Sequence, residues 1–358
     1  MTLNGSDFER FFLRGVSIPT RYFLAPINTG FVTRGEPDER LIRFHSERSG
    51  KKIGISYVGN VAIGSAYGAN QSTACLDYSS LRWNEISKAI RGQGSIPGIQ
   101  LACKFPTVDQ PAQRWVNRDL ASYVEGTRRK LTEIPKAVIE SIYTLFGRAS
   151  RLAVAAGFSV IQIHAAHGYF LSELFSRSLN LRADEFGHGE ALTRLVEIVR
   201  LECPDAILDI RVSLRDGLES FDISEQEYRA SQILQLAAFD VDLISLSAGL
   251  YEVDRFLIYP GKAVGEGAYM IEARRLAAEM PNKIWNVAGN VRNIQKFRTE
   301  EPLNLTVSIG RPLIADPSFV EKSINKQTSE IRNCIYSGHC HYYTRGKPHI
   351  SCKANADL

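Results

Sequence analysis

Short apolar runs rich in β-branched and aromatic residues recur along the chain, and most are separated by segments with helical periodicity. Runs of this kind, bounded by turn-forming residues, are typical of buried β-strands. Eight runs have this character: 22–25, 53–58, 97–101, 160–163, 208–212, 243–246, 284–287 and 305–309.

The clearest helical segment is 133–156, where apolar residues recur at spacings of three and four and therefore line one face of a helix. Within another segment, Ser224 and Glu227 have the spacing of a capping box, which satisfies backbone N–H groups at a helix start. The remaining helices are expected at 36–48, 191–202, 224–238 and 270–280.

Eight strands alternating with helices predict an α/β protein built as a closed (β/α)₈ TIM barrel. A doubly wound open sheet is the alternative, but it usually has fewer strands, and no G-x-G-x-x-G motif lies between an early strand and helix. We expect the barrel to occupy residues 1–330 and a C-terminal extension, 331–358, to pack on or beside it. The polar segment 105–130 follows the third strand, where it either lines the pocket or forms a surface excursion.

Composition narrows the class of protein without identifying it. The chain has 358 residues, of which 44% are hydrophobic, enough for a large core, and a net charge of +4 that is too small and dispersed to favour nucleic acid. The N-terminus lacks the basic and apolar regions of a signal peptide, and no apolar stretch approaches the roughly 18 residues of a membrane span. We therefore expect a cytoplasmic protein with a small-molecule substrate, no nucleic acid or membrane partner, and freedom to form a homo-oligomer.

Chemically capable side chains follow the fourth strand. His164 and His167 are succeeded by a glycine and Tyr169. Parallel α/β folds place their chemistry where strands end, so these side chains are expected to lie together on the catalytic face. Two imidazoles can hold one substrate oxygen, and a nearby phenol, with an unperturbed pKa of about 10, can supply a proton. The alternative is a pair of hydrogen-bonded core histidines beside a packed tyrosine.

Other strand ends also carry polar or small residues. Arg211 interrupts an apolar strand, where it is either a ligand-binding cation or half of a structural ion pair. The turns after the last two strands contain glycine, and Arg311 follows the second of them, an arrangement that suits a phosphate. The candidate residues at these strand ends are Ala25, Pro26, Asn28, Gln100, Arg211, Ala288, Gly289, Asn290, Gly310 and Arg311.

In combination these motifs resemble the old yellow enzyme family of FMN-dependent oxidoreductases. The resemblance extends from about Thr20 to Lys322, and its most specific parts are 155–176, 180–187 and 310–317. The Asn28-Thr-Gly30 strand end and the C-terminal cysteines look most like the iron–sulfur branch, which contains 2,4-dienoyl-CoA reductases and trimethylamine dehydrogenase-like enzymes.

The resemblance implies noncovalent FMN, with NAD(P)H as the reductant, and a role for each candidate residue. Ala25, Pro26 and Gly59 would line the flavin edge, with Asn28 near N5 and O4. Gln100 would bond the pyrimidine end, and Arg211 would lie by N1 and O2, where negative charge collects on reduced flavin. The phosphate would be held by Ala288, Gly289, Asn290, Gly310 and Arg311.

The resemblance also implies reduction of an activated C=C bond. His164 and His167 would donate to the substrate's carbonyl or nitro oxygen, and Tyr169 would protonate the α-carbon. The first alternative is a flavin-dependent dehydrogenase or demethylase of an amine, or a desaturase of a saturated carbonyl compound. The second, from another class, is an inert barrel that acts as a binding subunit.

The C-terminal cysteines depart from the pattern of the iron–sulfur branch, which is Cys-x₂-Cys-x₃-Cys-x₁₁-Cys. Here Cys334, Cys340 and Cys352 remain, Ser337 replaces the second thiolate, and the spacing to Cys340 is one residue short. A [4Fe–4S] cluster usually needs four thiolates, so we favour a decayed motif with free thiols and no metal. A cluster or a zinc ion held with a neighbouring histidine is the alternative.

Overall fold

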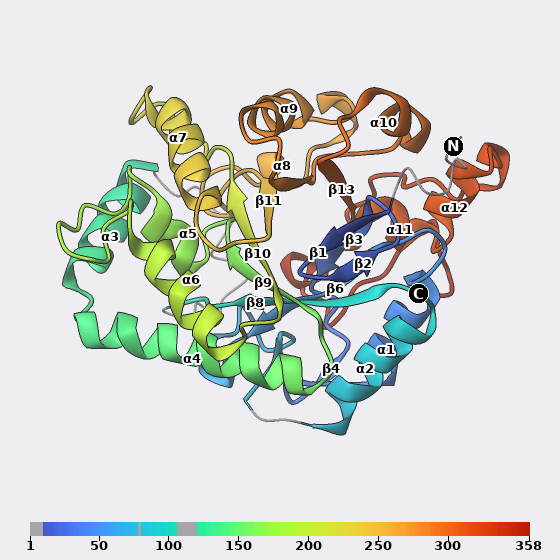
Figure 1. Cartoon of the computed structure of the whole chain (residues 1–358), viewed down its shortest axis with the longest axis horizontal. Coiled ribbons are helices and arrows are strands. Elements are labelled where there is room, and N and C mark those ends of the chain that lie inside the picture. The colour runs from blue at the N-terminus through green and yellow to red at the C-terminus, as the bar shows by residue number, and fades with distance from the viewer. Residues whose placement is uncertain (1–9, 78–79, 106–119) are drawn as a thin grey trace.

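Eight parallel strands close into a barrel, which confirms the predicted (β/α)₈ fold (Figure 1). The computed structural model describes residues 10–77, 80–105 and 120–358. The strand that comes last in the chain pairs with the first, so the barrel has no open edge between them. The strands are β3 (Tyr22–Ile27), β6 (Ile55–Ala62), β8 (Ile96–Ala102), β9 (Val160–Ala165), β10 (Ile207–Ser213), β11 (Leu243–Ser247), β12 (Ile284–Val287) and β13 (Leu305–Ile309).

Helices surround the strands, as Figure 1 shows, and bury the apolar faces that the sequence pattern predicts. Such cover explains why the strands are continuous apolar runs rather than alternating ones. The longer helices are α1 (Glu39–Arg48), α2 (Leu81–Gly92), α3 (Leu120–Glu133), α4 (Lys136–Ala155), α6 (Ala191–Glu202), α7 (Glu225–Ala237) and α9 (Met270–Glu279). The shorter ones are α5 (Phe170–Phe175), α8 (Arg255–Ile258), α10 (Ile294–Glu300), α11 (Arg311–Ala315) and α12 (Phe319–Ile324). No helix in the described ranges is long and apolar enough to cross a membrane.

The structure differs from the predictions at the starts of two helices, in the character of one connecting segment and at one helix cap. The helix expected at 36–48 starts later, because Asp38 caps it and residues 36–37 form β5 (Glu36–Pro37) against β4 (Val32–Thr33). The end of the polar segment 105–130 is helical, because α3 begins at Leu120, while 106–119 lie outside the described residues. Pro135 ends α3, so the helix expected at 133–156 begins at Lys136. The Ser224 hydroxyl donates to Asp222 Oδ1 at 2.6 Å, and its side chain makes no capping bond to α7.

An antiparallel hairpin covers the amino-terminal end of the barrel. It consists of β1 (Phe11–Leu13) and β2 (Val16–Ile18). Leu13 and Ile18 pack in one apolar cluster with residues at the beginnings of the barrel strands. Burial of a side chain of this size contributes about 1.5–3 kcal/mol to folding. This end of the barrel is therefore sealed, and the polar candidates lie towards the opposite end.

The segment 331–358 contacts the turn after the first barrel strand and helix α11, which follows the last one. Ile350 N–H donates to Thr29 O at 2.8 Å just after β3. Asn355 Nδ2 donates to Ile314 O at 3.0 Å in α11. These contacts place the C-terminal extension at the same end of the barrel as the candidate site residues.

Candidate active site

The candidate catalytic residues lie on a sharp turn between β9 and α5. His164 belongs to β9, and His167 and Gly168 have φ values of +66° and +77°, so the chain reverses there. A positive φ is strained for a residue with a side chain, and such strain is common at functional sites. The turn is held by Tyr251 N–H, which donates to His167 O at 3.3 Å. It places Tyr169 at the start of α5.

This turn brings the two imidazoles and the phenol together. The ring centroids of His164 and His167 are 5.0 Å apart, and those of His164 and Tyr169 are 4.5 Å apart. All three side chains are less than a tenth exposed. The structure thus brings together the three residues that the sequence analysis predicted to act in substrate polarisation and proton transfer.

The two histidines are neutral near pH 7. Burial lowers the pKa of both well below the usual 6.5, and the charge of Arg211 lowers it further. A neutral imidazole donates through one nitrogen and accepts through the other. His167 Nε2 lies 2.8 Å from Ser247 Oγ, whereas His164 Nδ1 is buried with no partner among the described residues. That unpaired nitrogen is available to a ligand.

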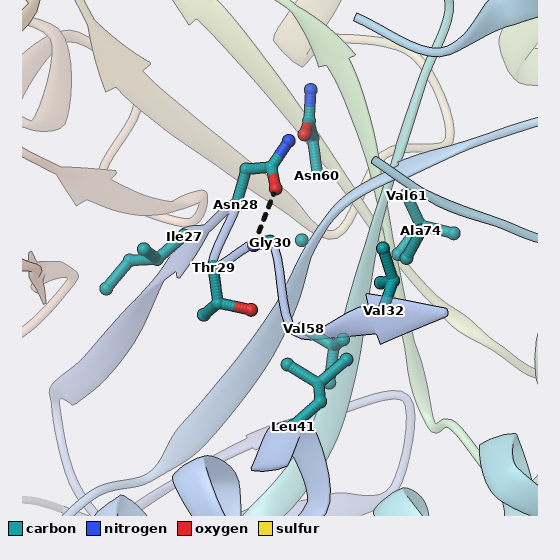
Figure 2. Close-up of a pocket in the computed structure, with 11 residues that line it drawn as sticks. Ile27, Asn28, Thr29, Gly30, Val32, Leu41, Val58, Asn60, Val61 and Ala74 are labelled. Atoms are coloured by element: carbon teal, nitrogen blue, oxygen red, sulfur yellow. Dashed lines mark hydrogen bonds between the residues drawn. The ribbon is translucent and has the colours of Figure 1, made fainter. Parts of the chain in front are cut away.

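Asn60 is a site residue that the sequence reasoning missed. It lies in β6, and its Nδ2 donates to the Tyr169 hydroxyl oxygen. Because that oxygen accepts from Asn60, the phenolic proton is left to point elsewhere. Figure 2 shows that Asn60 and Asn28 line one small cavity, about 10 Å³, which is room for roughly one water molecule.

Arg211 is a buried cation beside the histidines. Its side chain extends from β10, and its Nη2 donates to Ser247 Oγ at 3.3 Å, which is the one hydrogen bond it makes among the described residues. Ser247 also bonds His167, so the serine links the cation to the turn between β9 and α5. Burial lowers the guanidinium pKa, although Asp209 opposes this effect. The remaining guanidinium donors suit an electron-rich ligand edge.

Gly59 is tightly packed between two other candidate residues. A Cβ at this position would lie 2.8 Å from Gln100 Cβ and 2.9 Å from Pro26 Cβ. Glycine therefore lets β3, β6 and β8 bring their ends together, and a larger residue would displace Pro26 or Gln100. Ala25 lies close by, 3.8 Å from the position that a Cβ on Gly310 would take. The first and eighth strand ends thus meet, as the sequence prediction requires.

The seventh strand end is shaped by neighbouring side chains. A Cβ on Gly289 would lie 2.7 Å from the Tyr269 ring, so glycine is required there. Asn290, with φ of +54°, donates to Gly265 O and accepts from the Tyr336 hydroxyl at 2.7 Å. Arg311 donates to Pro260 O at 2.7 Å. Ala288 begins this turn, and its N–H donates to Leu246 O.

The C-terminal extension contributes aromatic side chains to the same region. Tyr342 OH donates to Asn28 Oδ1 at 2.9 Å, and Asn28 Nδ2 donates to Thr73 Oγ1 at 3.2 Å. The His341 ring packs on Tyr259, with ring centroids 4.1 Å apart, and the Tyr259 hydroxyl bonds that of Tyr251. Tyr251 in turn lies 6.1 Å from His167 between ring centroids. A continuous aromatic path therefore joins the catalytic turn to the extension.

The three C-terminal cysteines are free thiols in this structure. Burial raises the pKa of the Cys340 thiol to about 11, although Arg311 opposes this effect. Across residues 10–77, 80–105 and 120–358, no group of three or more His, Cys, Asp or Glu side chains is arranged to hold a metal ion.

We expect protein purified without oxygen to contain well under one equivalent of iron or zinc, because Ser337 replaces one thiolate of the four that a cluster needs. Metal analysis, with a visible spectrum of flavin alone, would check this expectation. Stoichiometric metal that is lost when Cys334, Cys340 or Cys352 is changed to serine would contradict it.

The side chains gathered here fit FMN. A buried guanidinium with spare donors suits the electron-rich pyrimidine ring. At the last two strand ends Gly289, Gly310 and Arg311 are all partly exposed, which leaves room for a phosphate there. Fold and site together are those expected of a TIM barrel that binds a flavin.

The chain belongs to the NADH:flavin oxidoreductase / NADH oxidase family, whose model matches residues 8–330. It is 25% identical to an NADH oxidase of Thermoanaerobacter brockii over 89% of this chain and 50% of the relative. It is also 25% identical to an NADPH dehydrogenase of Bacillus subtilis, over 89% of this chain and 94% of the relative. The chain spans about half the length of the first curated relatives it matches.

Among solved structures, the old yellow enzyme homologue from Zymomonas mobilis superimposes with a TM-score of 0.66 at 17% identity. The match covers 92% of this chain and 94% of that one. At this level of identity the likeness concerns the fold.

Proposed function

We propose that the protein reduces a C=C bond conjugated to a carbonyl or nitro group, with NAD(P)H as the source of electrons. The observation that carries the proposal is the packing of His164, His167 and Tyr169 within ring-centroid distances of 4.5 and 5.0 Å at the end of β9. FMN, when bound, supplies the hydride chemistry of the family. The chain's own residues bind and polarise the substrate and deliver the proton.

The imidazoles act on the substrate oxygen. Because both are neutral, each offers one N–H without placing a positive charge in the buried site. Two N–H donors on one oxygen withdraw electron density from the conjugated C=C bond and stabilise the negative charge that develops. Low exposure of both side chains excludes water and strengthens these bonds.

Tyr169 transfers its hydroxyl proton to the α-carbon of the substrate. Asn60 Nδ2 donates to the phenolic oxygen, so it orients the hydroxyl and stabilises the oxygen as the proton leaves.

Ser247 bonds both His167 and Arg211, and this fixes the imidazole relative to the cation at the cofactor site.

The absorption spectrum and turnover of purified protein test the proposal. A yellow protein with absorbance near 450 nm that NAD(P)H bleaches, and that an enone or nitroalkene restores anaerobically, would support it. Bleaching of the oxidised flavin by an amine or by a saturated carbonyl compound, with no NAD(P)H present, would instead favour the dehydrogenase alternative. Protein that takes up no FMN would favour the inert barrel.

We expect Arg211→Ala to weaken FMN binding by about 10- to 100-fold, the value of a hydrogen bond to a charged group, and to make the flavin harder to reduce. The reason is the loss of a buried cation from the cofactor site. Fluorescence titration and the midpoint potential measure the two effects. Arg215→Ala is the matched control, because Arg215 pairs with Glu272 instead. An unchanged potential in flavin-loaded Arg211→Ala protein would contradict the assignment.

A further inference from the structure

Five polar side chains form a layer inside the barrel beneath the candidate site. Gln100, Gln162 and Asp209 are register partners on β8, β9 and β10. Tyr57 from β6 and Ser245 from β11 complete the layer. All five are buried. Burying polar side chains inside the barrel is costly unless they are hydrogen-bonded, so the pattern of their bonds carries information.

The layer is organised by the Asp209 carboxyl group. Its Oδ2 accepts from the Tyr57 hydroxyl at 2.6 Å, from the Ser245 hydroxyl at 2.8 Å and from Gln162 Nε2 at 2.5 Å. An ionised carboxylate can only accept hydrogen bonds. Gln162 must therefore turn its amide nitrogen, and not its oxygen, towards Asp209.

The orientation of the Gln162 amide also determines the orientation of the Gln100 amide. With its nitrogen on Asp209 and Ser245, Gln162 directs its Oε1 to the other side, where it accepts from Gln100 Nε2 at 2.6 Å. Gln100 is left with its own Oε1, which lies 3.5 Å from the position of a Cβ on Gly59. The side chain thus presents an acceptor beside the residues that line the candidate flavin edge.

We propose that Asp209 is a positioning residue that, through Gln162, makes Gln100 present its carbonyl oxygen, so that the site selects a ligand with an N–H donor. The inference rests on the proposed binding of FMN, whose pyrimidine ring carries such a donor at N3. A reversed Gln100 amide would face that ring with a competing N–H and would leave one donor unpaired.

The protonation state of Asp209 decides whether Gln162 must turn its amide nitrogen towards the carboxyl group. Burial raises the pKa of Asp209 to about 6, while bonds from Tyr57, Gln162 and Ser245 and the charge of Arg211 oppose the rise. Of these surrounding groups, only Tyr57 and Arg211 are titratable: burial raises the pKa of the Tyr57 phenol and lowers that of the Arg211 guanidinium. Above about pH 6 the carboxylate only accepts, and below it the protonated carboxyl can also donate. The orientation of Gln162 is therefore enforced at neutral pH and released in acid.

The experiment follows FMN labelled with ¹⁵N at N3, bound to the wild-type chain and to two variants. At pH 7.5 the wild-type complex should show an N3–H proton resonance shifted downfield and protected from exchange with solvent. In Asp209→Asn the amide can donate or accept, so the resonance should lose its shift and protection, and FMN should bind about 3- to 10-fold more weakly. Tyr57→Phe is the matched control, since it removes one bond to the same carboxylate but keeps the acceptor for Gln162. It should retain the resonance.

The wild-type chain provides a second measurement that does not depend on the folding of a variant. Its N3–H resonance should move towards the Asp209→Asn position as the pH falls through 6. An N3–H resonance that is the same in wild type and Asp209→Asn, or that does not change between pH 7.5 and 5, would overturn the inference while leaving FMN binding intact. Failure of the wild-type chain to bind FMN would instead overturn the proposed function.

Discussion

Replacing Tyr169 by phenylalanine is expected to slow enone reduction by about 10²- to 10⁴-fold, the usual contribution of a general acid. Reduction of bound flavin by NAD(P)H should be nearly unchanged, because the phenol acts only on the proton that reaches the substrate. The ring itself packs against His164 and would be preserved by phenylalanine. Stopped-flow measurement of the two half-reactions separates the effects.

The substrate series gives a second check on the role of Tyr169. The slowing should be smallest for nitroalkenes, whose nitronate product is stable without immediate protonation. Tyr228→Phe is the matched control, since Tyr228 forms a separate phenol–imidazole pair with His188. If Tyr169→Phe blocked flavin reduction and left reoxidation untouched, the proposed mechanism would be wrong.

Removing either catalytic imidazole should slow flavin reoxidation by an enone about 10²- to 10³-fold, the usual cost of losing one donor to a developing oxyanion. His164→Ala and His167→Ala should also weaken phenol ligands, whose oxygen would occupy the position of the substrate oxygen. Titration of the flavin spectrum with a phenol measures this directly. His188→Ala should leave both properties unchanged.

A different distribution of effects would identify a structural role for the histidines. If His164→Ala lowered thermal stability but left phenol affinity and reoxidation rate at the wild-type values, His164 would be a packed core residue. The same comparison applies to His167, whose bond to Ser247 also supports the turn. Measuring both ligand affinity and stability in each variant therefore separates catalysis from packing.

The barrel was predictable because its strands are buried on both faces, and strands buried in this way are contiguous apolar runs in the sequence. Strand ends were less predictable. The apolar run 53–58 stops before Gly59, and a glycine at that point usually indicates a turn. In the structure β6 continues to Ala62, and Gly59 is a glycine because a Cβ there would lie too close to Gln100 and Pro26. Asn60 was missed for this reason, since it lies within the part of the strand that the pattern excluded.

The residues supplied by the C-terminal extension could not be predicted by local pattern. Asn28 and Tyr342 lie at opposite ends of the chain, and the spacing of apolar residues along the sequence does not indicate that their side chains form a hydrogen bond. Tyr251 and Tyr259 follow the sixth strand, where the rule that chemistry gathers at strand ends applies equally. That strand end carries no charged or histidine residue in its first positions, so nothing in its sequence drew notice.

Two asparagines of the candidate cofactor site hold the extension in place: Asn28 accepts from Tyr342, and Asn290 accepts from Tyr336. Any ligand that orders these amides favours the docked extension, and a docked extension prepares the amides for that ligand. The two equilibria therefore share one coupling free energy, which acts equally in both directions. Loss of cofactor would loosen the end of the chain, and release of the extension would weaken cofactor affinity by the same factor.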